Sequence, residues 1–351
     1  MSINAYKPVL ASINFFLLIC LLIFTVFFNA CQTTKEKPDI SNIDVNLSFK
    51  RFEQDLFNID TTNYEKGLDE LSQKYPNYFN FYVEKLMNFG AIDSARSYQN
   101  AMIPFLKNKD IQSLYDTAMV KYPNLEGLKK EFTTAFQYTK YYLPEVQIPT
   151  VYTHIAEFGP AAATYGSNIL AINLDMYFGK DYPYYKSIGI PTYLSQRFEE
   201  PYIIPNTLKA YFQELYPQSN EYNLLIDFMI QEGKMLYLLD IVLPDTPDSL
   251  KIGYSQEQLK WCKGSEPMMW NFFVEGDWLF SPKYREFQKF LNEAPTTSGM
   301  PPESPGKTAI WVGWQIVRKF MEKNPDITVA ELMKLQDGQV FLQKAGYKPR
   351  L

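Results

Sequence analysis

The chain has 351 residues, a formal net charge of −5 and a single histidine. Its 34 Lys and Arg residues form no basic stripe, which argues against a nucleic-acid partner. The 26 Phe, 26 Tyr and 5 Trp residues predict an aromatic core.

The N-terminus has the pattern of an export signal. A 20-residue apolar stretch over 9–28 follows Lys7 and precedes Ala30 and Cys31. A positive start, an apolar stretch and a small residue before a cysteine resemble a bacterial lipoprotein signal. We therefore expect a signal peptide over 1–30 and a lipid attached to Cys31. The alternative is an uncleaved transmembrane anchor, because 20 apolar residues also span a bilayer.

Removal of residues 1–30 leaves 321 residues with a net charge of −6. Residues 31–46 are polar and predict a tether, and 47–351 predict a single globular domain. In the mature chain Cys31 takes the lipid, so Cys262 has no cysteine with which to form an intramolecular disulfide. We expect Cys262 to be a buried, inert thiol.

The expected fold is mostly α with a small β-sheet, an α+β arrangement. Apolar residues recur at three and four positions within 47–145 and predict six helices, at 51–57, 64–73, 78–89, 94–106, 111–119 and 125–141. Within 147–175, the stretches 147–155 and 168–174 predict a small sheet with a hairpin. After a loop that ends at residue 205, helices are predicted within 206–351, at 207–216, 221–242, 255–277, 281–292 and 307–322. Thr328 and Glu331 then fit a capping box, and Gly346 marks a C-terminal helix end.

The single histidine restricts the possible chemistry. His154 lies in the predicted strand and shares a face with Tyr152, which favours a structural role. One histidine is too few for an HExxH or two-histidine zinc site. We therefore predict no metal, no cofactor and no catalytic residue, and the protein is not expected to be an enzyme.

Glu232 is the one carboxylate in an unusual position. Its neighbours one helical turn away are all apolar: Phe228, Met229, Met235 and Leu236. Burial of an unpaired carboxylate costs several kcal/mol, so we expect an Arg, a Lys or a hydrogen-bond donor within reach, for example Arg318 or Arg197, or else a raised pKa. A structural pair is the favoured interpretation, and a functional carboxylate is the alternative.

Two glycines in apolar helices predict close helix packing. Gly233 follows Glu232, and Gly313 lies between Trp311 and Trp314 in a helix that is apolar nearly all round. Glycine is unfavourable inside a helix, which suggests that another backbone approaches at each position. The two tryptophans are expected in the core, although they would also suit a ligand groove.

Several motifs together resemble the GldB family of gliding-motility lipoproteins of Bacteroidota. They are RFEQDLF at 51–57, INLDMYFGKDYP at 172–183, QEGKMLY at 231–237, GWQIV at 313–317 and GYKP at 346–349. They follow a lipoprotein signal in the family order. The resemblance implies a role in gliding motility and in the type 9 secretion machinery on which motility depends.

The order of small sheet, helix and Glu-Gly helix is also similar to zinc peptidases of the gluzincin, or zincin-like, kind. Glu232 matches the position of their third metal ligand. Leu208-Lys209-Ala210-Tyr211-Phe212 stands where HExxH is required and contains no histidine. This similarity implies a degenerate metallopeptidase scaffold that has lost its metal.

These observations favour a non-catalytic lipoprotein, anchored by acylated Cys31 in the cell envelope and facing the periplasm. Its expected partners are membrane lipid and protein components of the gliding and secretion apparatus. One alternative is a hydrolase that uses paired carboxylates, which requires two carboxyl groups about 5 to 10 Å apart. Another is a carbohydrate or peptide binder that stacks its ligand on Tyr and Trp rings.

Overall fold

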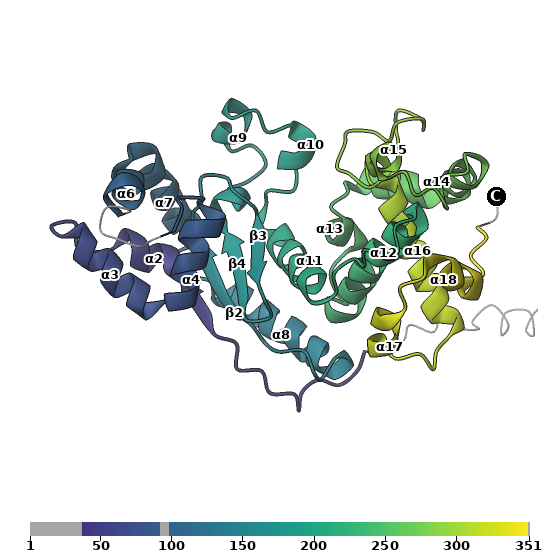
Figure 1. The fold of residues 1–351 in the computed structure, drawn as a ribbon, viewed down its shortest axis with the longest axis horizontal. Helices are drawn as coiled ribbons and strands as arrows, with labels where there is room; N and C mark the ends of the chain where they lie inside the picture. Colours follow the sequence, from purple (N-terminus) through teal and green to yellow (C-terminus); the bar gives the residue numbers. More distant parts are fainter. Residues whose placement is uncertain (1–36, 92–97, 350–351) are drawn as a thin grey trace, which may run out of the picture. The chain divides into compact units, whose positions relative to one another are not determined.

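The computed structural model describes residues 37–91 and 98–349 (Figure 1). The predicted signal peptide and Cys31 lie outside the described residues. The compact unit begins at Ile40, and both Ile40 and Val45 pack against its core. The Gln137 side chain donates a hydrogen bond of 2.8 Å to the Ile43 carbonyl. The domain therefore includes the end of the segment 31–46, which the sequence predicted as a tether.

The sheet has four strands in the order β1-β2-β4-β3. Strands β1 (Phe49–Arg51), β2 (Thr150–His154) and β4 (Ile169–Asn173) are parallel, and β3 (Ala162–Tyr165) is antiparallel to β4. The sheet contains a hairpin, as predicted, which is formed by β3 and β4, and Gly166 in its turn has a φ of +57°. The two predicted strands, 147–155 and 168–174, correspond to β2 and β4, which are parallel to each other. Strands β1 and β3 could not be predicted, because strands of three or four residues are too short for a periodic pattern.

The structure is mostly helical, as predicted. The helices before β2 are α2 (Phe52–Phe57), α3 (Tyr64–Lys74), α4 (Pro76–Phe81), α6 (Ile103–Lys107), α7 (Lys109–Lys121) and α8 (Glu126–Tyr142). Those after β4 are α9 (Pro183–Ser187), α10 (Thr192–Ser195), α11 (Ile203–Leu215), α12 (Leu225–Val242), α13 (Asp248–Ile252), α14 (Gln256–Glu275), α15 (Tyr284–Phe287), α16 (Thr308–Lys323), α17 (Val329–Lys334) and α18 (Gly338–Ala345). No helix in the described residues is long and apolar enough to cross a membrane.

Some helix boundaries differ from the prediction. Short helices α9 and α10 occupy the expected loop, and α11 begins before residue 205. The predicted helix over 281–292 is only the short α15 followed by a 3₁₀ turn over Gln288–Phe290. The capping box at α17 is confirmed, since Thr328 N–H donates to Glu331 Oε2 at 2.8 Å and Glu331 N–H donates to Thr328 Oγ1 at 3.2 Å.

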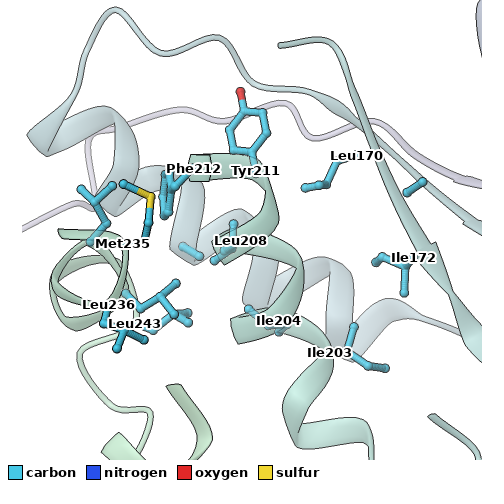
Figure 2. Close-up of a cluster of buried hydrophobic side chains, with 14 of the residues drawn as sticks. Leu170, Ile172, Ile203, Ile204, Leu208, Tyr211, Phe212, Met235, Leu236 and Leu243 are labelled. Atoms are coloured by element: carbon cyan, nitrogen blue, oxygen red, sulfur yellow. The ribbon is translucent and has the colours of Figure 1, made fainter. Parts of the chain in front are cut away.

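Helix α11 contacts both the sheet and α12, and therefore links the two parts of the core. Leu170 and Ile172 of β4 lie on the sheet side of α11, whereas Phe212 faces Met235 of α12 (Figure 2). All four of these side chains, like Leu208 at the centre of α11, are fully buried. Apolar packing thus fixes the position of α11 against α12, where Glu232 lies.

Candidate functional site around Glu232

Glu232 makes its polar contacts with α11. Lys209 Nζ lies 2.7 Å from Glu232 Oε2, and Gln213 Nε2 donates to Glu232 Oε1 at 2.9 Å. Lys209 and Gln213 are four residues apart and therefore share one face of their helix. The side chains of Glu232 and Lys209 are 24% and 25% exposed. The contact is consequently a partly exposed ion pair between two helices and lies outside the closed core.

The surroundings of Glu232 favour its ionised form. Burial alone would raise its pKa, but the positive charge of Lys209 and the hydrogen bonds from Lys209 and Gln213 outweigh burial, so the pKa is lowered. Glu232 is therefore a carboxylate at neutral pH. A general acid instead requires a raised pKa.

Glu232 has a cation and a hydrogen-bond donor as partners, as predicted, but neither of the two named arginines is among them. Arg318 binds Asp240 at 2.7 Å and Asp248 at 2.9 Å, and its guanidinium lies 3.8 Å from the centre of the Trp314 ring. Arg197 pairs with Glu293 at 2.6 Å. The partner of Glu232 is Lys209, which stands in the segment that replaces HExxH.

The predicted close approach at the two glycines is confirmed. A Cβ atom at Gly313 of α16 would lie 1.9 Å from the Met229 carbonyl oxygen of α12, and one at Gly233 would lie 2.5 Å from the Gly313 carbonyl carbon. The backbones of α12 and α16 are therefore in direct contact at Gly233, the residue that follows Glu232.

Trp311 and Trp314 are 1% and 0% exposed, so they belong to the core as predicted and line no open groove.

His154 and Cys262 are both buried, as their structural interpretations require. Tyr78 Oη lies 2.8 Å from His154 Nδ1, and Tyr78 stacks on Tyr152, the neighbour of His154 on the same face. Burial lowers the pKa of His154 to about 3 and raises that of Cys262 to about 12. A neutral imidazole and a protonated thiol are therefore expected at neutral pH. In the part of the chain that the structure describes, no three His, Cys, Asp or Glu side chains are grouped to hold a metal ion.

Comparison with known proteins identifies the family. The family described as gliding motility protein GldB matches residues 33–349, nearly the whole chain after the predicted signal. The chain belongs to the GldB family. Membership assigns the protein a role in gliding motility, and the family is one of lipoproteins. Searches of curated proteins and of solved structures found no significant match.

This GldB-family chain has a buried carboxylate that the sequence analysis did not single out. Asp175 is fully buried after β4 and accepts hydrogen bonds from the N–H groups of Ala156 at 2.9 Å and Phe158 at 3.2 Å. Burial raises its pKa to about 7, although these hydrogen bonds oppose the shift. Glu157 and Phe158 have φ values of 49° and 63°, so the loop adopts an unfavourable conformation around the carboxylate. An acidic residue directly after an apolar strand was the available signal.

Glu53 is a second buried carboxylate in the GldB-family domain that was not singled out. It pairs with Arg51 at 2.6 Å and accepts a hydrogen bond of 2.6 Å from the Thr153 hydroxyl. Burial raises its pKa even though Arg51 opposes the shift. Arg51 also donates to the Tyr122 carbonyl at 2.7 Å. Because these contacts join β1, α2, β2 and the end of α7, Glu53 connects elements of the fold.

Proposed function

We propose that the protein is a non-catalytic lipoprotein, anchored through acylated Cys31, that faces the periplasm and supports the gliding and type 9 secretion apparatus by binding its protein components. The arrangement around Glu232 carries this proposal. Its carboxylate is held by the Lys209 ammonium group and the Gln213 amide, and its pKa is lowered. A hydrolase with paired carboxylates needs a general acid whose pKa is raised.

The same contacts support descent from a zincin-like scaffold. In such a scaffold two ligands lie four residues apart on one helix and the third is a Glu on the next helix. Lys209 and Gln213, each one residue after Leu208 and Phe212 of the sequence match, have this spacing, and both reach Glu232. The Lys209 ammonium supplies the positive charge that a metal ion would supply to the carboxylate. We propose that this ion pair replaces the lost metal site.

The proposal is tested in the host by replacing the gene with Cys31→Ala, Glu232→Gln and Glu214→Gln variants. Glu214 is an exposed carboxylate of the neighbouring helix and serves as the matched control. We expect Cys31→Ala to lose fatty-acid labelling and colony spreading, and both Glu→Gln variants to spread normally. Protein levels are measured by immunoblot.

Two results would contradict the proposal. Unchanged labelling of Cys31→Ala would refute the lipoprotein anchor. A Glu232→Gln protein that is folded and present at normal levels while spreading fails, with Glu214→Gln unaffected, would instead favour the carboxylate-dependent hydrolase.

A further inference from the structure

A polar pocket of about 350 Å³ lies apart from the residues that contact Glu232. Two chain segments form its wall: residues 180–202, between β4 and α11, and residues 253–258, which run from the end of α13 into the first turn of α14. Most of the side chains that line it are polar or charged, and they include Lys180, Tyr193, Gln196, Arg197, Tyr202 and Gln258. A pocket of this size and polarity suits a small polar ligand or one end of a larger one.

Arg197 has unused hydrogen-bonding capacity at this pocket. Its Nη1 donates to Glu293 at 2.6 Å, and its Nε is closed off from solvent. Its Nη2 has no hydrogen-bond partner among the described residues. The side chain is 17% exposed. A guanidinium carries five N–H donors in a planar fork that matches a carboxylate. The Nη2 of Arg197 is therefore the group that can donate to a carboxylate in the pocket.

The positive charge of Arg197 is only partly neutralised. Glu293 also pairs with Lys307 at 2.7 Å, so one carboxylate serves two cations. The Lys307 ammonium is held in place because it donates to the Ile252 carbonyl at 2.6 Å. This group of three side chains has a net charge of +1, and Arg197 is its member in the pocket wall.

The backbone leaves space for this arginine. Gly253, the residue after α13, has a φ of +77°, and a Cβ atom there would lie 2.6 Å from Arg197 Cδ. Any larger residue at 253 would therefore displace the arginine as well as strain the turn.

Asp181 and Glu199 also line the pocket, and with Lys180 they reduce the net charge of +1 on the Arg197, Glu293 and Lys307 group to zero. An anion without donors would be repelled by these two carboxylates. A ligand that combines one carboxylate with neighbouring O–H or N–H groups satisfies both kinds of lining residue. We propose that this pocket binds such a carboxylate, with Arg197 as its main contact. A peptide C-terminus and an acidic sugar both have this chemistry.

Binding is measured on the full chain in detergent by ligand-observed NMR titration. The peptide probes are acetyl-alanyl-alanine and its C-terminal amide, and the sugar probes are glucuronate and glucose. We expect at least one carboxylate probe to bind at least tenfold more tightly than its uncharged counterpart. The acid that binds identifies the source of the carboxylate.

Variants then test the assignment of Arg197. Arg197→Gln is expected to weaken binding of the preferred acid at least tenfold. Arg285→Gln, which removes an exposed arginine of α15, is expected to leave binding unchanged. If Arg197→Gln fails to fold, Lys180→Gln decides the question, because Lys180 is exposed and a two- to fivefold loss is expected. The proposal would be overturned if no probe binds, or if the acids bind no more tightly than their uncharged counterparts. It would also be overturned by unchanged binding in Arg197→Gln, or in Lys180→Gln if Arg197→Gln does not fold.

Discussion

The ion pair between Glu232 and Lys209 permits a quantitative prediction. Exposed ion pairs contribute about 0.2 to 1 kcal/mol, and breaking a buried pair costs about 3 to 5 kcal/mol. The two side chains are 24% and 25% exposed, so the pair lies between these limits. We expect a coupling free energy of about 1 to 2 kcal/mol at neutral pH.

A double-mutant cycle measures this coupling directly. The variants are Glu232→Gln, Lys209→Met and the double replacement, each unfolded with urea as the full chain in detergent. Glu232→Gln retains the volume of the side chain and an oxygen for Gln213. Lys209→Met retains most of the aliphatic stem. The cycle therefore removes the charge interaction with little loss of packing.

The dependence of the coupling on pH provides an independent check. The pKa of Glu232 is lowered in the folded protein relative to an unfolded value of about 4.3. Its contribution to stability is therefore fully present above about pH 4.3 and is lost as the pH falls through the lower, folded pKa. A coupling below about 0.3 kcal/mol at pH 7, or one that does not decrease in acid, would refute this account of Glu232.

Three further predictions concern packing, metal binding and acid stability. Gly313→Ala should lower the free energy of unfolding by about 3 kcal/mol or more, because the new methyl group overlaps α12. Gly127→Ala is the control, since a Cβ atom there meets no atom within 4 Å, and equal melting temperatures of the two variants would contradict the packing. Lys209→His with Gln213→His should bind one zinc per chain by elemental analysis while the wild-type protein binds none; zinc in the wild type, or none in the variant, would refute the replaced metal site. His154 has a pKa of about 3 in the folded protein, so its NMR signals should not titrate between pH 8 and 5. The stability of the protein should fall as the pH drops below about 6.5, the pKa of an unfolded histidine. An NMR titration midpoint near pH 6.5 in the folded protein would contradict the burial of His154.

Features with a strong local pattern could be predicted from the sequence. The spacing of apolar residues predicts most of the long helices. Gly233 and Gly313 each predict a close contact with another helix, although the sequence does not show which helix that is. A glycine inside a helix lowers the stability of the helix, so it needs a structural reason. In this chain the reason is the direct backbone contact between α12 and α16. Short elements such as β1 and β3 carried no comparable pattern.

Partners across helices could not be predicted in the same way. The apolar neighbours of Glu232 showed that it needed a partner, but the identity of that partner depends on how α11 is rotated against α12. That rotation is set by the packing of Leu208 and Phe212. The sequence shows that both side chains are apolar but does not show which residues they contact. The sequence pattern indicates that an Arg, a Lys or another donor is needed, and the packing of the two helices determines that the cation is Lys209.

Glu232 breaks the apolar pattern of its helix, and stability alone is a weak reason for such a residue. Apolar residues of similar volume often replace an ion pair with no loss of stability. The backbone contact between Gly233 and Gly313 already fixes α12 against α16, so the position of the helix does not depend on the carboxylate. Its retention therefore points to descent from a working site or to a present function. The double replacement in the cycle separates these two, because a stable variant that still supports spreading leaves only descent.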